Sequence, residues 1–270
     1  MDLDAYLERI GFEGSLRVDE QTLVALHEAH LAHIPYENLD IQLGERKILS
    51  EARFEERLVS GHRGGWCYEM NGLFSAALRE IGFSVVRVGG AVVRDVIGEA
   101  SIGNHMVLLV DLDRRWVADV GLGDGPLHPF PLEVRSWSEG GFEYALERTD
   151  DAWWRFQNHA HGLAPRFDFM ETARYLDWYE GQCQSLQTGE DSPFLGLAMT
   201  FRRDAKRIRA LRDLTYLEIE GAHKTEHRIE SADEYASVLD TLIDFELGAE
   251  LETLWETVRS RVRRREAESG

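Results

Sequence analysis

Cys67 is the residue of this sequence best placed to act as a nucleophile. It follows two glycines in the run RGGWCYEMN (residues 63–71) and stands at the predicted start of a helix. Unpaired backbone N–H groups and the positive end of the helix dipole favour a thiolate there, and the glycines let the backbone approach a reacting acyl oxygen. The competing interpretation is a small buried hydrophobic residue, which is the usual role of a free cysteine.

A thiol nucleophile needs a base, and His105 opens the apolar run at residues 106–110. The turn-like residues 111–114 lie midway between His105 and Asp119. In an antiparallel hairpin folded about Leu112, this histidine and this aspartate face each other, because each stands seven positions from the turn centre. A register slip of one residue would separate them. Taken singly, each is more simply interpreted as a solvated side chain at a strand end.

Cys67, His105 and Asp119 together have the composition of a catalytic triad with sulfur as the nucleophile. The histidine accepts the thiol proton, and the aspartate fixes the imidazole tautomer. Three classes of function are compatible with this set: acyl transfer, amide synthesis or hydrolysis by a cysteine enzyme, and ligand binding on a degenerate scaffold. The intact triad disfavours the third class.

The motifs around these residues resemble those of one enzyme family. The run RGGWCYEMNGLF (residues 63–74) resembles the active-site signature of arylamine N-acetyltransferases. IPYENLDI (residues 34–41) is similar to their Pro-Phe-Glu-Asn-Leu element, and DVGLG (residues 119–123) is similar to their Asp-Val-Gly-Phe-Gly. The resemblance extends to SLQTGEDSPF (residues 185–194) and LTYLEIEG (residues 214–221), and so to nearly the whole chain.

This resemblance implies a reaction and its partners. Cys67 would accept the acetyl group of acetyl-coenzyme A, with His105 as the base and Asp119 as the third member of the triad. The acceptor would be an arylamine, an arylhydrazine or a related amine, and the alternative is an amide synthase or cysteine hydrolase that uses the same triad. Coenzyme A and the small-molecule acceptor would be the partners, with no nucleic acid, membrane or metal involved.

The resemblance also implies an α+β fold in three parts around a core like that of cysteine proteases and transglutaminase-like enzymes. A helical domain with the catalytic cysteine would span residues 1–83. An antiparallel β-barrel domain with the catalytic histidine and aspartate would span residues 84–187. An α/β lid would span residues 188–270.

Further residues in the matched segments are candidates for substrate or coenzyme A binding. Tyr36 and Leu122 stand where the family usually has phenylalanine, so we expect them, together with Tyr68, to contact the acceptor and to shift its selectivity. Gly125 belongs to a glycine-rich loop without the lysine and spacing of a phosphate-binding loop, and we interpret it as a passage for coenzyme A. Ser192 is a second candidate for the coenzyme A site, although a turn serine is the commoner explanation.

Three residues are candidates for supporting the triad. Glu37 and Arg63 fall in two of the matched motifs, and a buried ion pair between them would fasten the catalytic loop; a surface pair worth little is the alternative. Asn71, one helical turn after Cys67, is expected to hold the loop of Asp119 by hydrogen bonds, unless it is a solvated helix residue.

The remaining cysteine and histidines offer little further chemistry. Cys183 has neither a helix start nor a glycine pair beside it, so we interpret it as structural. His159 and His161 form a His-x-His pair without a third ligand at suitable spacing, which argues against a metal site.

The composition predicts a folded cytoplasmic protein that binds small molecules. The chain has 270 residues, of which 43% are hydrophobic and 29% charged, and this is enough for more than one core. Its formal net charge of −19 argues against binding to nucleic acid or anionic membranes. No run of about 18 apolar residues occurs, and the N-terminus carries acids where a signal peptide carries basic residues.

Periodicity predicts the elements that must position the triad. Apolar residues follow helical spacing behind a possible N-cap at Asp19, and again from Met70 to a predicted helix end at Gly82. From about residue 84 short runs of branched and aromatic residues predict strands. After a break at residues 192–194 we expect a strand, a hairpin and a closing helix, in the segments listed here: residues 197–203, 214–221 with 223–230, and 232–265.

Overall fold

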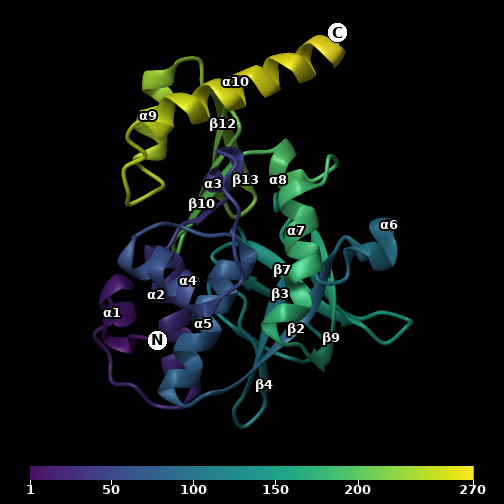
Figure 1. The fold of residues 1–270 in the computed structure, drawn as a ribbon. Helices are drawn as coiled ribbons and strands as arrows, with labels where there is room; N and C mark the ends of the chain where they lie inside the picture. Colours follow the sequence, from purple (N-terminus) through teal and green to yellow (C-terminus); the bar gives the residue numbers. More distant parts are fainter. Residues whose placement is uncertain (270) are drawn as a thin grey trace.

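Figure 1 shows the computed structural model, which describes residues 1–269. The N-terminal helices lie beside a curled sheet, and the last helix lies at the opposite end, above a second sheet. The helices are α1 (Leu3–Arg9), α2 (Glu20–His33), α3 (Leu39–Gln42), α4 (Glu51–Phe54), α5 (Cys67–Ile81), α6 (Arg94–Ile97), α7 (Glu180–Thr188), α8 (Pro193–Gly196), α9 (Ala232–Leu239) and α10 (Glu250–Ser269). A π-helix (Glu55–Ser60) and two 3₁₀-helices (Gly98–Ser101 and Leu176–Tyr179) complete the helical part.

The predicted helix boundaries near the site are confirmed. Asp19 caps α2, where its side chain accepts a hydrogen bond from the backbone of Thr22 at 2.9 Å. Helix α5 begins at Cys67 and ends at Gly82, which adopts a left-handed φ of 111°. The inner face of α5 is buried against the sheet, so the position of Cys67 is fixed by the main hydrophobic core.

The central sheet has eight antiparallel strands in the order β5-β4-β3-β2-β9-β8-β7-β6. Its two edge strands, β5 and β6, are consecutive in the chain and are joined by only three residues, 132–134. Such a short connection spans about 14 Å at most, so the sheet must curl until its edges approach each other. The strands are β2 (Ser84–Val92), β3 (His105–Asp111), β4 (Arg115–Val117), β5 (Phe130–Pro131), β6 (Arg135–Glu139), β7 (Phe142–Arg148), β8 (Trp154–Gln157) and β9 (Arg166–Ala173).

Strands β3 and β4 form the predicted hairpin, but the register differs from the expected one by two residues. Leu109 pairs with Val117, so the hairpin is centred on Asp113 and not on Leu112. Because the shift is an even number of residues, the predicted histidine and aspartate keep the same face of the sheet. The ladder ends at Val117, and the chain then turns toward α5.

A second sheet has the order β1-β10-β11-β12-β13, all antiparallel. The predicted strand and hairpin of the C-terminal part are confirmed, whereas β1 and β11 are additions. Strand β1 comes from the N-terminal part, so this sheet crosses the division into residues 1–83, 84–187 and 188–270, which stays a prediction. The strands are β1 (Tyr36–Glu37), β10 (Met199–Arg203), β11 (Ile208–Arg212), β12 (Thr215–Glu220) and β13 (His223–Arg228).

The single closing helix expected over residues 232–265 is wrong, because the chain leaves the helix after Leu239 and resumes it at Glu250. The intervening Leu242 and Ile243 are buried in a second core with Trp255, which a straight helix could not place together. No helix within residues 1–269 is long and apolar enough to cross a membrane.

Candidate active site

The structure brings Cys67, His105 and Asp119 together from three elements. Cys67 is the first residue of α5, His105 is the first residue of β3, and Asp119 follows β4. The Nε2–H group of His105 donates a hydrogen bond to Oδ2 of Asp119 at 2.6 Å. All three side chains are nearly inaccessible to solvent, so water does not screen the interactions between them.

Asn71 and Gly121 fix the turn that carries Asp119. The side-chain amide of Asn71 donates to Oδ1 of Asp119 at 2.7 Å and to the carbonyl oxygen of Met106 at 2.7 Å. Its Oδ1 accepts from the backbone N–H of Val120 at 3.0 Å. A Cβ atom on Gly121 would lie 2.4 Å from the amide nitrogen of Asn71 and 2.9 Å from Cα of Cys67. The turn therefore packs directly on α5, and Asn71 bonds the turn to this helix.

The charged form of Asp119 is stabilised by its hydrogen bonds. Burial opposes ionisation, but the charge of His105 and hydrogen bonds from His105, Asn71 and Gly121 outweigh it and hold the pKa of Asp119 below its ordinary value. A carboxylate at this place keeps the proton of the neutral imidazole on Nε2. The other nitrogen, Nδ1, is then free to accept a proton.

At Cys67, burial opposes the effect of the helix terminus, which favours a thiolate. Burial raises the pKa of the Cys67 thiol well above its ordinary value, and the charge of Asp119 raises it further. The backbone N–H groups of Tyr68 and Met106 donate to the sulfur and act in the opposite direction. Loss of the proton to bulk water is therefore unfavourable, and ionisation requires a proton acceptor inside the site.

A cavity of about 330 Å³ opens onto the triad. Cys67 and His105 line it, and so do Tyr36 and Leu122, two of the three residues expected to contact the acceptor. Most of the remaining lining is apolar and comes from four segments: residues 92–97, residues 163–165, residues 193–197 and strand β10. The cavity suits an apolar molecule better than a polar one.

Three of the predicted binding residues do not line this cavity. Tyr68 donates its hydroxyl hydrogen to the carbonyl oxygen of Gly103 at 2.6 Å. Gly125 lies against the side chain of Leu122: a Cβ atom on Gly125 would lie 3.0 Å from Cδ2 of Leu122. Ser192 caps α8, where its hydroxyl accepts from the backbone of Phe194 at 3.1 Å. The hydroxyl groups of Tyr68 and Ser192 are thus engaged in contacts within the protein.

Arg63 forms its ion pairs with Asp40 and Glu250, and not with Glu37 as the motifs suggested. The carboxylate of Glu37 instead accepts from the backbone N–H of Leu39 at 2.6 Å. The buried carboxylate that pairs with Arg63 therefore belongs to Asp40 on α3, three residues after Glu37.

Asp40 is the centre of a buried ionic network that the sequence reasoning missed. Lys47 lies 2.6 Å from Oδ2 of Asp40 and 3.6 Å from Oε2 of Glu69. Arg57 contacts the carboxylates of both Asp40 and Glu69, with its Nε 3.1 Å from Oε1 of Glu69. Oε2 of Glu69 also accepts from the backbone N–H of Trp66, which precedes Cys67. The network therefore fixes the first turn of α5.

The glycine pair at residues 64 and 65 allows close packing of the loop before Cys67 against neighbouring residues. A Cβ atom on Gly64 would lie 2.5 Å from the carbonyl oxygen of Pro35, and one on Gly65 would lie 2.9 Å from Cβ of Glu69. The loop runs against β1, to which it is joined by a parallel bridge between Tyr36 and Gly65. Larger residues would push α5 away from this strand.

Asp124, in the glycine-rich loop, is a second supporting residue that the sequence reasoning missed. It is fully buried, and Oδ2 accepts from the backbone N–H of Leu163 at 2.6 Å and from Arg212 at 3.3 Å. Oδ1 accepts from the amide of Asn158 at 3.1 Å. This carboxylate ties the Leu122 loop to the opposite wall of the cavity and to the second sheet.

The residues interpreted as structural lie outside the cavity. Cys183 is buried on α7 beside the side chain of Gln187, whose amide lies 3.1 Å from its sulfur. His159 is buried, with Nε2 donating to the carbonyl oxygen of Asp124 at 3.0 Å. Across the described part of the chain, no three histidine, cysteine, aspartate or glutamate side chains gather as a metal site would require.

Comparisons with known proteins point in one direction. A family model described as N-acetyltransferase matches residues 19–252. The arylamine N-acetyltransferase of Escherichia coli (strain K12) is 38% identical over 176 residues, which are 63% of this chain and 62% of that protein. The chain therefore spans about three fifths of that relative in the matched region. The arylamine N-acetyltransferase 1 of Oryctolagus cuniculus is 25% identical over 279 residues, which cover 93% of this chain and 96% of that protein.

Solved structures match over almost the whole chain. The arylamine N-acetyltransferase from Mycobacterium abscessus has a TM-score of 0.86 at 27% identity, over 96% of this chain and 95% of that one. The enzyme from Nocardia farcinica has a TM-score of 0.84 at 32% identity, over 94% and 93%. The Mycobacterium marinum protein in complex with CoA has a TM-score of 0.83 at 25% identity, over 97% and 98%.

Proposed function

Because the chain belongs to the arylamine N-acetyltransferase family, we propose that it moves an acetyl group from acetyl-coenzyme A to an arylamine or arylhydrazine through a thioester on Cys67. The observation that carries this proposal is the triad: a cysteine at a helix start and a carboxylate-bound imidazole line one apolar cavity. The complex of the Mycobacterium marinum relative with CoA supports coenzyme A as the carrier.

In the first half-reaction His105 takes the thiol proton of Cys67 at Nδ1. The imidazolium that results is stabilised by Asp119 through the 2.6 Å hydrogen bond, and it offsets the charge that otherwise raises the pKa of the thiol. The thiolate attacks the acetyl carbonyl carbon of acetyl-coenzyme A, and a new carbon–sulfur bond forms. The bond to coenzyme A breaks, and the departing thiolate takes the proton from His105.

In the second half-reaction the amine nitrogen attacks the carbonyl carbon of the acetyl-Cys67 thioester. His105 takes the proton that the nitrogen loses, the bond to Cys67 breaks, and an acetamide leaves. The proton held by the imidazolium returns to the sulfur, so the enzyme regains its starting state. Each half-reaction uses the same base and the same nucleophile, in agreement with a single cavity.

Transfer is favoured over hydrolysis by the surroundings of the thioester. Side chains of the triad are buried, and the cavity is walled mainly by Leu, Pro, Phe and Val residues. An apolar wall holds little water near the carbonyl carbon, whereas it binds the ring of an arylamine. The thioester therefore persists until an amine enters.

Steady-state kinetics test this proposal. Initial rates measured while both acetyl-coenzyme A and an arylamine are varied should give parallel double-reciprocal lines, because coenzyme A leaves before the amine binds. Intersecting lines would indicate direct transfer within a ternary complex and would contradict the thioester. Release of free coenzyme A in large excess over acetylated amine would favour a hydrolase instead.

A further inference from the structure

Residues 93–97, which we call the strap, close one side of the cavity. The strap follows β2 and consists of Val93 and the short helix α6. Val93 and Ile97 line the cavity that contains the triad cysteine. Farther along, Asn104 accepts a hydrogen bond from the backbone of Val92 at 2.8 Å, and it stands directly before His105. The strap is thus joined at its base to the segment that carries the catalytic base.

The backbone of the strap is held in an unfavourable conformation at Val93. This residue has a φ of 47° and a ψ of 44°, in the left-handed region. A β-branched side chain rarely adopts this conformation, and it persists only where the surrounding contacts impose it. Relaxation of Val93 to an ordinary conformation would redirect the chain and move Ile97 relative to the cavity.

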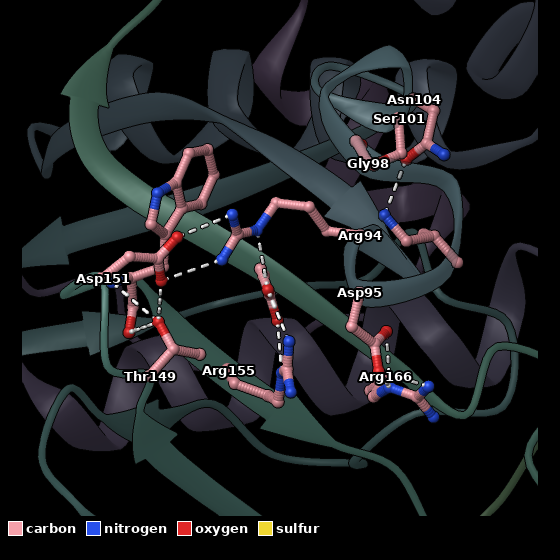
Figure 2. A network of polar contacts seen from close by, with 12 residues as sticks. Arg94, Asp95, Gly98, Ser101, Asn104, Thr149, Asp151, Arg155 and Arg166 are labelled. Carbon is pink, nitrogen blue, oxygen red and sulfur yellow. Dashed lines mark hydrogen bonds and ion pairs between the residues drawn. The ribbon is translucent and has the colours of Figure 1, made fainter.

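Arg94 makes contacts that could hold the strap in this conformation (Figure 2). Its two terminal nitrogens donate to both oxygens of Asp151, at 2.8 and 3.0 Å, and its Nε donates to Asp168 at 2.8 Å. The guanidinium lies over the ring of Trp153, 4.3 Å from its centre. Arg155 holds Asp168 from the other side at 2.7 and 2.9 Å. Arg94 is therefore fixed at three points, of which Asp168 lies on β9 and Asp151 and Trp153 lie in the loop between β7 and β8.

Asp95 adds a second attachment beside the first. Nε of Arg166 donates to both oxygens of Asp95 at 2.9 Å, and a terminal nitrogen of Arg166 donates to Oδ2 at 2.6 Å. The backbone carbonyl of Arg166 also accepts from the N–H of Val93 at 3.1 Å. Bidentate pairs between a guanidinium and a carboxylate fix orientation as well as distance, so two adjacent strap residues are clamped to β9 and its neighbours.

We propose that Arg94 is a positioning residue: clamped by Asp151 and Asp168, it holds Val93 in its left-handed conformation and so fixes Val93 and Ile97 as the wall that selects the apolar part of the amine acceptor. This inference rests on the proposed function. The wall fits the acceptor better than the arm of coenzyme A, because that arm is a chain of amides that needs polar partners, while both wall side chains are aliphatic. Ile97 lines the cavity and is also exposed to solvent, so substituents that extend beyond the ring would meet it.

The test separates the two half-reactions in the full-length protein. Arg94→Ala should leave the rate of Cys67 acetylation by acetyl-coenzyme A unchanged, as measured by intact mass. It should raise the KM for an arylamine with a bulky ring substituent about tenfold, equivalent to ~1.4 kcal/mol, and the KM for unsubstituted aniline much less. Arg94→Lys, which keeps the charge but loses the bidentate geometry, should fall between. Arg114→Ala removes an exposed arginine stacked on Trp116 elsewhere on the sheet, and should change neither rate.

A second background tests the link to Val93. Glycine accepts a left-handed conformation without strain, so in a Val93→Gly protein the additional change Arg94→Ala should alter the KM ratio by less than about twofold. An equal effect of Arg94→Ala in both backgrounds, or equal losses in both half-reactions, would overturn the inference. Failure of the unaltered protein to form acetyl-Cys67 would instead overturn the proposed function.

Discussion

Asn71 on α5 and His105 on β3 each bind one oxygen of Asp119: the Asn71 amide lies 2.7 Å from Oδ1, and His105 Nε2 lies 2.6 Å from Oδ2. The helix that begins with Cys67 is thereby bonded to the carboxylate that contacts His105. A displacement of α5 is therefore transmitted to the whole triad.

Asn71→Ala should reduce the rate of amine acetylation by about 10- to 100-fold, because misplacement of the triad by about 1 Å has effects of this size. The change also leaves the Met106 carbonyl and the Val120 N–H without their partner. Ser75→Ala is the matched control, since it removes a buried polar group from the same helix away from the triad. Similar losses of activity in both variants would show that Asn71 acts only through stability.

Acid should destabilise the protein through His27. Burial lowers the pKa of His27 to about 4, and only the hydrogen bond from Nδ1 to the carbonyl of Leu127 opposes it strongly. The unfolded chain takes up a proton near its ordinary value of about 6.5 while the folded protein does not, so stability is full above that pH and falls between it and about 4, by ~3 kcal/mol in all.

Urea unfolding followed between pH 7.5 and 5 checks this expectation. His27→Gln, which cannot titrate, should flatten the dependence of the free energy of unfolding on pH. His33→Gln is the control, because it changes an exposed histidine on the same helix. An unchanged slope in His27→Gln would assign the acid sensitivity to other groups. His30 and His159 are the next candidates, since burial lowers the pKa of His30 well below its ordinary value and that of His159 to about 4.

Asp40→Asn should destabilise the protein by about 3 kcal/mol, because it removes the buried carboxylate that three cations share and leaves Lys47 and Arg57 with Glu69 alone. Lys47, Arg57 and Arg63 all contact this carboxylate. Glu56→Gln is the control: it breaks the exposed pair with Arg53 and should cost less than about 1 kcal/mol. Thermal unfolding measures both. Equal small shifts would mean that the network contributes little to the position of α5.

Leu122→Phe should change the ratio of kcat/KM for a bulky and a slim arylamine by about tenfold at most, since ring contacts are worth about 0.5–1.5 kcal/mol. Leu122 lines the cavity, while the acetylation of Cys67 precedes amine binding. Leu127→Phe is the control, because Leu127 is buried in the core and a larger ring there should lower the melting temperature. A large loss of stability in Leu122→Phe with unchanged amine preference would assign Leu122 to the core as well.

The sequence predicts that His105 and Asp119 share a face of the sheet, because this depends only on whether their separation is an even number of residues. Placing the turn centre at Leu112 in place of Asp113 shifted the register by two residues, and the face of each strand was unaffected. The start of α5 at Cys67 followed from helical spacing and from the glycine at its end. Local patterns of this kind survive small errors in position.

The supporting network could not be found in this way. Asp40, Lys47, Arg57 and Glu69 come from four segments, and no periodicity links charged residues that meet only after folding. Strand β1 has two residues and carries no pattern of its own; it becomes a strand because β10 pairs with it. The interruption between α9 and α10 reflects burial of side chains in the second core, which local propensity does not report.

The covalent intermediate is tested most directly by weighing the protein after incubation with acetyl-coenzyme A in the absence of any amine. The account predicts one added acetyl group, located on Cys67 by peptide mapping, lost on addition of an arylamine, absent in Cys67→Ser and retained in Cys183→Ser. An unmodified protein, or an acetyl group that persists in Cys67→Ser and still passes to the amine, would contradict it.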